Sequence, residues 1–488
     1  MSEMRLRFPP SPTGKIHIGN MRTALFNWLW VRKNDGELVL RIEDTDQERS
    51  TREFEDIILQ ELNWLGIDVD EGVKNGGEYG PYRQSERLEI YQEYAQKLLD
   101  EDKAYYCYCS PEELDEMREE AKARGEMPRY DGRCRHLTEE EKEKYEEEGR
   151  EPVIRFKTPT DEQDIIVEDL IRGDVEFNTS VLDDFIIFKS DGMPTYNFAV
   201  VIDDALMKVT QVIRGEDHLS NTPKQILIYD ALGFDTPKFA HLPLILDENK
   251  AKLKKRGGDN TVYIGEFRNK GYLPEALFNF LALLGWSADD EQEIISRKEL
   301  VEQFDLREVN KSAAVFDVEK LNWMNGKYIR EADLDRIVDL SLPYLKSAGY
   351  IDDSSGVDHD WLRRVIEVAR TGVDYLAQIP EEAELFFTEL EFADREKASE
   401  EFAEEGVELV FSTLKKKLND LDKLTLDNIN NIFSEMRDEL PVGARTIYHP
   451  VRLALTGKTS GPEISELIYI FGIDEVEKRL DNAIELAN

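Results

Sequence analysis

The loop at residues 9–20 has a composition that could do chemistry. It reads Pro-Pro-Ser-Pro-Thr-Gly-Lys-Ile-His-Ile-Gly-Asn and lies between two apolar segments. Its prolines stiffen the backbone, and its two glycines let that backbone approach a ligand closely. A loop of this kind at the start of a helix directs free N–H groups at a phosphate. It therefore indicates a phosphate site that includes His17, against the alternative of an ordinary strand-to-helix connection.

A basic run, Lys252-Leu253-Lys254-Lys255-Arg256, precedes two glycines in an otherwise acidic chain. Lysines on a mobile loop can close over a polyphosphate and stabilise the charge that builds on a leaving group. The alternative is a solvated patch of surface charge. Together with the loop at 9–20, the run predicts the second half of a phosphate clamp.

All the cysteines of the chain fall in one short region, as Cys107, Cys109 and Cys134, and His136 lies beside the last of them. Three cysteines give no paired disulfide framework, and thiols of a cytoplasmic protein stay reduced. Three thiolates and one imidazole form a closed, tetrahedral structural zinc site. The alternative is three small buried residues and a surface histidine.

Alternating helix and strand patterns must position these groups. Residues 4–8 and 37–46 have strand character, whereas 21–30 and 52–66 show the apolar spacing of helices. This order predicts an α/β N-terminal half with a Rossmann-like, doubly wound parallel sheet. Beyond about residue 330, apolar residues recur at three- and four-residue steps, which predicts a mainly α-helical C-terminal half with a helix over 361–377.

Composition changes along the chain suggest where its domains begin and end. The cysteine-containing stretch holds short strand-like pieces and charged helices, so we expect an α+β zinc-containing module inserted into the sheet. We expect the first half of the catalytic domain at 1–102, the insertion at 103–193, the second half at 194–250, a domain with the lysine loop at 251–330, and a helical domain at 331–488.

The chain has 488 residues and a formal net charge of −41. No apolar run approaches the roughly 20 residues of a membrane span, and no signal peptide is evident, so we expect a cytoplasmic protein. The charge alone argues against a nucleic-acid partner, but screening over about 8 Å lets a local basic groove bind one. The excess acid predicts a solvated surface adapted to salt.

The loop at 9–20 resembles the His-Ile-Gly-His signature of class I aminoacyl-tRNA synthetases, in its glutamyl-tRNA synthetase form. The basic run resembles the Lys-Met-Ser-Lys-Ser loop of that class, with Lys254 where the family usually has serine and Asn20 where the general signature has a second histidine. The resemblance implies catalytic roles for His17, Lys252 and Lys255. The implied ATP-binding set is Pro10, Thr13, Gly14, His17, Gly19, Lys252 and Lys255.

Four other motifs match the amino-acid pocket of the glutamyl family: Arg-Phe-Pro-Pro-Ser-Pro, Arg-Ile-Glu-Asp-Thr-Asp, Met-Pro-Thr-Tyr-Asn and Ile-Arg-Gly-Glu-Asp-His. A substrate with two carboxylates needs guanidinium groups, and its ammonium group needs an acid. The resemblance also implies one structural Zn²⁺ at the cysteines and His136, and Mg²⁺ with ATP. The implied glutamate-binding residues are Arg7, Ser11, Glu43, Tyr196 and Arg214.

Cations and an aromatic residue alternate between Arg445 and Arg452 in the helical half. This combination suits stacked, charged RNA bases, although a connection between helices would look similar. The resemblance favours tRNA binding by Arg445 and Arg452 in an anticodon-binding region.

The resemblance covers nearly the whole chain. It implies a monomeric enzyme that activates L-glutamate with ATP to glutamyl-adenylate and passes the glutamyl group to the 3'-terminal adenosine of tRNA(Glu). Alternatives are an enzyme that also charges tRNA(Gln), a glutaminyl enzyme, a stand-alone enzyme that glutamylates a modified tRNA base, and a weakly active tRNA-binding paralogue. Residues 331–488 argue against the stand-alone enzyme.

Overall fold

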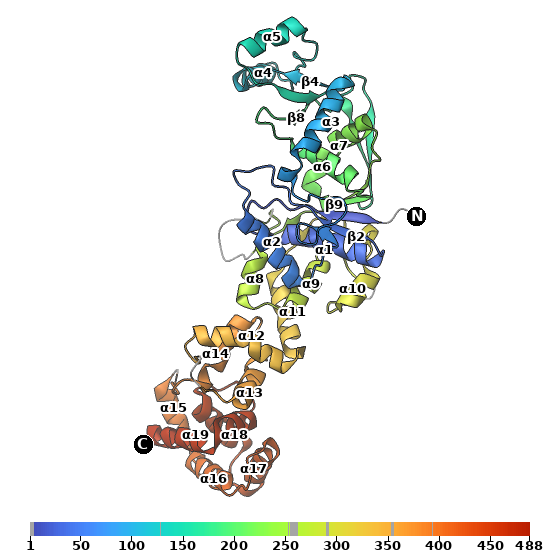
Figure 1. The fold of residues 1–488 in the computed structure, drawn as a ribbon. Coiled ribbons are helices and arrows are strands. Elements are labelled where there is room, and N and C mark those ends of the chain that lie inside the picture. The colour runs from blue at the N-terminus through green and yellow to red at the C-terminus, as the bar shows by residue number, and fades with distance from the viewer. Residues whose placement is uncertain are drawn as a thin grey trace. The chain divides into compact units, whose positions relative to one another are not determined.

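The computed structural model describes residues 4–126, 128–251, 253, 262–288, 292–352, 356–392 and 394–488. The chain divides into two compact units (Figure 1). The first comprises residues 1–269 and 274–321, and the second comprises 270–273 and 322–488. Lys252 and Lys255 lie outside the described residues, so their predicted roles stay predictions.

Three parallel strands form the start of the first unit: β1 (Arg5–Phe8), β2 (Glu37–Leu40) and β3 (Glu71–Gly72), in the order β1-β2-β3. All four residues of β1 are buried, Arg5 and Arg7 included, because a parallel sheet is covered on both faces. The strand predicted at 4–8 is present as Arg5–Phe8, whereas the strand character predicted over 37–46 ends at Leu40.

A second set of strands has the order β7-β6-β10-β9. Here β6 (Asp164–Asp169), β10 (Lys238–Leu242) and β9 (Gln211–Gly215) are parallel, and β7 (Gly173–Asn178) is antiparallel at the edge. The Thr210 N–H, just before β9, donates to the Arg5 carbonyl at 2.8 Å, so β9 lies beside β1. The sheet therefore also draws strands from the range that the sequence assigns to the insertion.

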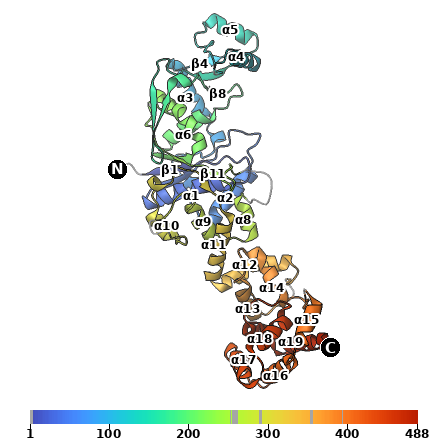
Figure 2. The ribbon, with the colours of Figure 1, turned by 180° about the vertical axis from the view of Figure 1, so that it is seen from behind.

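Helices cover both sides of these strands. On one side, α1 (Ile18–Lys33) packs on β1 and β9, with α9 (Pro274–Ala282) and α10 (Arg297–Gln303) against it. Figures 1 and 2 show α3, α6 and α7 on the opposite side. Their bounds are Leu88–Asp100, Tyr196–Leu206 and Thr222–Leu232. The mixed α/β character predicted for the N-terminal half is confirmed.

A small antiparallel sheet carries the cysteines, with the order β4-β5-β8. Its strands are β4 (Ala104–Cys107), β5 (Val153–Phe156) and β8 (Ile186–Phe188). Between β4 and β5 lie α4 (Pro111–Ala123) and α5 (Glu139–Glu147), each of which begins with a capping box. The remaining elements of this unit are α2 (Arg52–Leu65), β11 (Ile245–Leu246), α8 (Ile264–Lys270) and β12 (Ala314–Val315).

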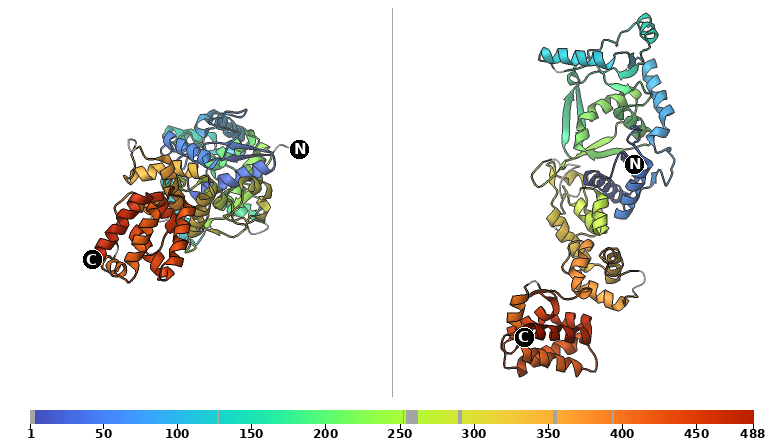
Figure 3. Two further views of the ribbon diagram at one scale, coloured as in Figure 1. Left: turned by 90° about the horizontal axis from the view of Figure 1, so that it is seen from below. Right: turned by 90° about the vertical axis from the view of Figure 1, so that its left-hand side faces the viewer.

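The second unit is helical in its described residues, as predicted (Figure 3). The helix expected over 361–377 is shorter in the structure, where α13 ends at Ala369. Thr371 and Gly372, both poor helix formers, follow its C-cap Arg370. Gly472 has a φ of 76° and interrupts the last helix. No described helix has the length and apolar character of a membrane span. The helices are α11 (Val318–Glu331), which spans the boundary, α12 (Leu334–Ser347), α13 (His359–Ala369), α14 (Ile379–Ala383), α15 (Arg395–Phe402), α16 (Val407–Asn419), α17 (Leu426–Glu439), α18 (Ala444–Thr456) and α19 (Ile464–Ala487).

Candidate active site

The loop at 9–20 joins the end of β1 to the start of α1. His17 is the N-cap of α1, and its Nδ1 accepts the Gly19 N–H at 3.1 Å. The Glu43 N–H donates to the Pro10 carbonyl at 3.0 Å, which attaches the loop to the segment after β2. A Cβ at Gly14 would meet no atom within 4 Å, so this part of the loop borders open space. The loop is therefore fixed to the segment after β2 at Pro10, and it has space for a ligand at Gly14.

The predicted ATP-binding residues of this loop share one short stretch but differ in exposure. Pro10 is buried, Thr13 is exposed, and Gly14, His17 and Gly19 are half-buried. Their common location at the N-terminus of a 16-residue helix suits an anion, because the positive end of the helix dipole lies there.

The segment that follows the basic run pairs directly with the histidine loop. The Ile18 N–H donates to the Val262 carbonyl at 2.9 Å, and the Ile264 N–H donates to the Ile16 carbonyl at 3.2 Å. The rings of His17 and Tyr263 meet edge to face, with centroids 6.2 Å apart. Two segments far apart in the sequence are thus joined at the predicted phosphate site.

Four of the five predicted glutamate-binding residues come together near the sheet. Arg7 lies on β1, Glu43 follows β2, Arg214 lies on β9, and Tyr196 begins α6. Burial raises the pKa of Tyr196, and the charges of Arg214, Glu43 and Arg7 all act on it. Ser11, the fifth, is exposed in the loop.

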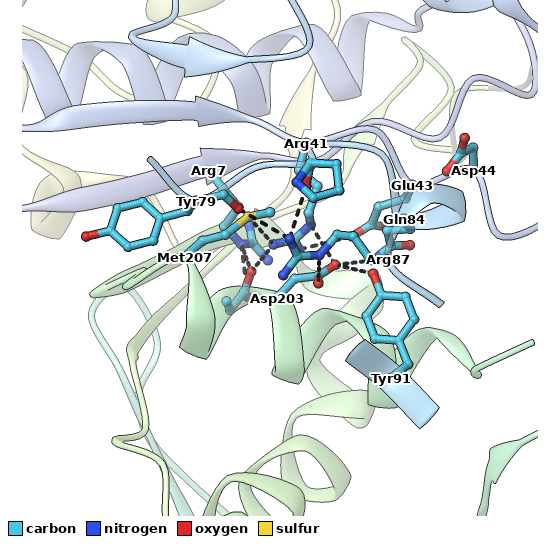
Figure 4. Close-up of polar contacts among 12 residues, drawn as sticks. Arg7, Arg41, Glu43, Asp44, Tyr79, Gln84, Arg87, Tyr91, Asp203 and Met207 are labelled. Carbon is cyan, nitrogen blue, oxygen red and sulfur yellow. Dashed lines mark hydrogen bonds and ion pairs between the residues drawn. The ribbon is translucent and has the colours of Figure 1, made fainter. Parts of the chain in front are cut away.

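Two adjacent acids on α6, Asp203 and Asp204, form the centre of a buried ion-pair network (Figure 4). Asp204 accepts from Arg7 Nε at 3.1 Å and from Arg41 Nη1 at 2.7 Å. Asp203 accepts from Arg87 Nε at 2.7 Å. Sequence reasoning missed this network. Its signal was a pair of acids directly after the apolar run 198–202 of a helix.

Asp203 also accepts hydrogen bonds from two neutral groups, the Tyr91 hydroxyl at 2.8 Å and the Gln84 amide at 2.9 Å (Figure 4). A carboxylate buried without such donors would be strongly destabilised. The donors therefore allow α6 to hold a buried charge at Asp203.

The electrostatics around Arg7 and Glu43 bear on how this region could bind a charged ligand. Burial raises the pKa of Glu43 to about 6, although Arg41 opposes the shift. Burial also acts to raise the pKa of Asp204, but Arg7 and Arg41 outweigh it and the pKa is lowered. Arg7 Nη1 is buried and has no hydrogen-bond partner among the described residues. One guanidinium group thus retains a donor for a further acceptor.

Arg214 is buried and held at two nitrogens. Its Nε donates to His241 Nε2 at 3.1 Å, and its Nη2 donates to the Thr222 hydroxyl at 2.8 Å. Burial lowers the pKa of Arg214, but a guanidinium group stays charged at neutral pH. The residue is therefore a fixed cation and not a surface arginine.

The three cysteines gather at the end of β4. The sulfurs of Cys107, Cys109 and Cys134 all lie within 4.8 Å of one another. The structure does not bring His136 to this group: its side chain is exposed, and its charge acts on Asp102. The Tyr130 hydroxyl lies beside the cluster instead.

Tyr130 contacts the cysteine cluster through its hydroxyl oxygen. This atom lies 3.4 Å from Cys107 Sγ and accepts the Cys134 N–H at 3.1 Å. The Arg155 guanidinium group stacks over the Tyr130 ring at 3.8 Å. Three sulfurs at this spacing, with an oxygen beside them, fit a tetrahedral ion whose metal–sulfur bonds are about 2.3 Å.

The two arginines predicted to bind tRNA differ in their surroundings on α18. Arg445 is exposed, as is Tyr448 one turn later. Arg452 is half-buried, and its Nη1 donates to the Gly461 carbonyl at 2.9 Å. Arg452 therefore stabilises the loop before α19, whereas Arg445 and Tyr448 face solvent.

Comparison with known families and structures agrees with this geometry. The family described as tRNA synthetases class I (E and Q), catalytic domain, matches residues 3–323, and an anticodon binding domain matches residues 336–484. The glutamate–tRNA ligase 2 of Caldanaerobacter subterraneus subsp. tengcongensis is 52% identical over all 488 residues of both chains. The glutamate–tRNA ligase of Carboxydothermus hydrogenoformans is 52% identical over 480 residues, which cover 98% of this chain and 99% of that one.

A solved structure is similar over its full length. The glutamate tRNA ligase from Elizabethkingia meningosepticum CCUG26117, crystallised in complex with its amino acid, superposes with a TM-score of 0.91 at 38% identity and covers all of both chains. The fold and the site thus define a catalytic half of the class I type and a helical anticodon-binding half. The chain belongs to the class I tRNA synthetases of the glutamate and glutamine group, and within them to the glutamate–tRNA ligases. The family resemblance of the sequence motifs is confirmed.

Proposed function

We propose that this chain activates L-glutamate with ATP and transfers the glutamyl group to the 3'-terminal adenosine of tRNA(Glu). The observation that carries the proposal is the gathering of Arg7, Arg214 and Glu43 around Tyr196, with the Glu43 N–H bonded to the Pro10 carbonyl of the histidine loop. Cations for two carboxylates and an acid for an ammonium group therefore lie next to a phosphate site.

The chemical step needs positioning and charge neutralisation more than a protein nucleophile. An oxygen of the glutamate α-carboxylate attacks the α-phosphorus of ATP, the bond to the β-phosphate breaks, and pyrophosphate leaves. His17 and the positive end of the α1 dipole would attract the phosphates from one side. Lys252 and Lys255 would stabilise the departing pyrophosphate, and Mg²⁺ would accompany ATP as its counter-ion. The activated glutamyl group then passes to the tRNA hydroxyl, and AMP leaves.

Within the pocket, Arg214 would bind the side-chain carboxylate of glutamate, and Glu43 would bind its ammonium group. Arg7 Nη1 would donate to one of the two carboxylates. Tyr196 and Ser11 would complete the polar lining. Both arginines are buried, so a carboxylate that binds them is desolvated, which strengthens the interaction relative to water.

The proposal is tested by charging purified transcripts of tRNA(Glu) and tRNA(Gln) with radiolabelled glutamate and ATP. We expect tRNA-dependent incorporation on tRNA(Glu), and none with glutamine in place of glutamate. Incorporation on both transcripts would support the alternative of an enzyme that does not discriminate between them. Binding of tRNA without any acylation would overturn the proposal in favour of a paralogue.

The domain roles extend the same proposal along the chain. The insertion at 103–193 would contact the acceptor stem, the region at 251–330 the stem and the pyrophosphate, and the helices at 331–488 the anticodon. Arg445 with Tyr448 is the exposed pair that suits RNA bases. We propose further that the protein acts as a monomer in the cytoplasm.

We propose that the cysteine cluster holds one structural Zn²⁺ through Cys107, Cys109 and Cys134. The sequence assigns the fourth position to His136, and the nearest oxygen to the cluster is the Tyr130 hydroxyl. When bound, the ion would fix the turn after β4 and the loop before α5 to each other.

Zinc content distinguishes these possibilities. The purified protein is expected to contain one zinc per chain, and Cys109→Ser is expected to lose it. His136→Ala and Tyr130→Phe form a matched pair. In a chelator titration, we expect the affinity for zinc to fall by about 10- to 100-fold in the variant that removes the fourth ligand, and to be unchanged in the other. Wild-type protein without zinc would refute the site.

A further inference from the structure

Three buried residues form a line across three neighbouring strands. Asp169 ends β6, His241 lies on β10, and Arg214 lies on β9 directly opposite His241 in the parallel register. His241 Nδ1 lies 2.6 Å from Asp169 Oδ2, and His241 Nε2 lies 3.1 Å from Arg214 Nε. The side chains of Asp169 and His241 are fully buried. The sequence motif around Arg214 did not predict its link to His241 and Asp169.

The hydrogen bonds fix where each proton lies. Asp169 Oδ1 accepts the N–H groups of Ile171 and Arg172, at 2.9 and 2.8 Å, and Oδ2 accepts the His241 N–H at 3.0 Å. Burial acts to raise the pKa of Asp169, but its hydrogen bonds outweigh that effect, so it is a carboxylate that only accepts. His241 must therefore carry its proton on Nδ1 and present the lone pair of Nε2 to Arg214.

A neutral imidazole is the form that this arrangement needs. Burial lowers the pKa of His241 and the Arg214 charge lowers it further, against the opposing effect of Asp169. The negative Asp169 polarises the ring, which makes Nε2 a stronger acceptor for the guanidinium group. The Thr222 hydroxyl accepts from Nη2 at 2.8 Å, so two nitrogens of Arg214 are fixed.

We propose that Asp169 and His241 are positioning residues that orient Arg214 toward the side-chain carboxylate of glutamate. The inference rests on the proposed function, in which Arg214 binds that carboxylate. Nε and Nη2 are engaged by the protein, and Nη1 is the nitrogen assigned to the ligand. A planar guanidinium group held at two corners is pre-organised, whereas an unrestrained one would lose conformational freedom on binding.

Asp169→Asn tests the direction of the protons. The amide oxygen is held by the N–H groups of Ile171 and Arg172, so the amide nitrogen faces His241. There it loses the bond from the His241 backbone N–H and forces Nδ1 to accept. The ring proton then moves to Nε2 and opposes the Arg214 Nε–H. We expect KM for glutamate to rise about 10- to 100-fold, while kcat and KM for ATP change by less than about threefold.

Asp164→Asn, an exposed position on the same strand, is the matched control and leaves all the constants unchanged. An equal rise in the KM for ATP and for glutamate, or no rise in either, would overturn the proposal.

Two substitutions of His241 separate its Nδ1 contact with Asp169 from its Nε2 contacts with Arg214 and with the Thr222 hydroxyl, which lies 3.2 Å away. The amide oxygen of His241→Gln reaches the Nε2 position and can accept from Arg214, whereas His241→Asn can only reach Asp169. We expect the glutamine variant to keep a KM for glutamate within about fivefold of wild type, and the asparagine variant to resemble Asp169→Asn. Equal effects of both variants would show only a loss of packing and would count against positioning.

The tautomer is observed directly by ¹⁵N NMR of histidine-labelled protein, with the His241 signal assigned by its loss in His241→Gln. We expect an Nδ1-protonated neutral ring in the wild type and an Nε2-protonated ring in Asp169→Asn. An imidazolium ring or the opposite tautomer in the wild type would refute the inference.

The failure of this inference is distinguishable from failure of the proposed function. If the wild type charges no tRNA with glutamate, the proposed function is wrong. If it does, and Arg214→Lys raises KM for glutamate while Asp169→Asn does not, only the positioning role is wrong.

Discussion

At the scale of single residues, the site is built on charge that the protein has already buried and paired. Arg41 is fully buried and contacts Asp204 and Glu43, and Asp204 also binds Arg7. Burying such ions is unfavourable unless each has a partner, so the pairs restrict one another to a single arrangement. Glutamate would enter a pocket in which the orientation of the charges is already set.

Asp204→Asn is expected to lower the free energy of unfolding at pH 7 by about 3–5 kcal/mol, because it leaves Arg7 and Arg41 buried with one carboxylate fewer. The folded pKa of Asp204 lies below its unfolded value. Its contribution is therefore present above about pH 4 and is lost as the pH falls through the folded pKa.

Urea denaturation at several pH values measures this effect. Asp46→Asn, which breaks the exposed pair with Arg49, is the control, and we expect it to change stability by about 1 kcal/mol or less. A loss of similar size in both variants would contradict the assignment of Asp204 to the central network.

The pKa of Glu43, raised to about 6 by burial, predicts a pH dependence of substrate binding. Below that pH the carboxyl group is protonated and cannot pair with an ammonium group, so kcat/KM for glutamate should fall as the pH drops from 7 to 5. Glu43→Gln should have a low kcat/KM that changes little over this range. A profile of kcat/KM against pH for both proteins checks this, and an unchanged slope in the variant would assign the titration to another group.

At the scale of elements, the site depends on strand ends and helix starts that meet at one edge of the sheet. The loop after β1 leads to α1, which begins at Ile18. The segment at 262–264 pairs with His17, the residue before this helix, and with Ile18. Residues 262–264 therefore lie at the start of α1. A substitution in the segment at 262–264 should therefore alter ATP binding at the histidine loop.

Tyr263→Ala removes the ring that meets His17 edge to face, at 6.2 Å between centroids. We expect kcat/KM for ATP to fall about three- to tenfold, in line with the usual strength of such contacts. Tyr263→Phe keeps the ring and should stay within about twofold of wild type. Varying ATP at saturating glutamate and tRNA measures both, and equal losses would show that the ring contact is not the cause.

At the scale of the whole molecule, the dominant property is the net charge of −41. Exposed carboxylates repel one another in the folded protein, and added salt screens this repulsion. We expect the melting temperature to rise as sodium chloride is increased from low concentration. A flat or falling curve would contradict the interpretation of the acidic surface as an adaptation to salt.

Much of the fold followed from local pattern. The apolar spacing at 52–66 and its glycine stop predicted a helix that the structure has at Arg52–Leu65. The helix expected over 361–377 was too long, because the structure breaks it at Thr371 and Gly372. Local spacing reports one helix face well, but it does not report which strands become neighbours. For that reason β6 and β7 were assigned to the insertion although they extend the central sheet.

The sequence by itself determined the family, the histidine loop and the candidate residues of the pocket, because these depend on residue types at fixed short spacings. Only the tertiary structure decided how they are held. Arg214 is oriented through His241 and Asp169 on two other strands, and Arg7 is paired with Asp204 on α6. Such partners are separated by tens to hundreds of residues, and hydrogen bonds depend on distance and direction in space, which no local pattern records.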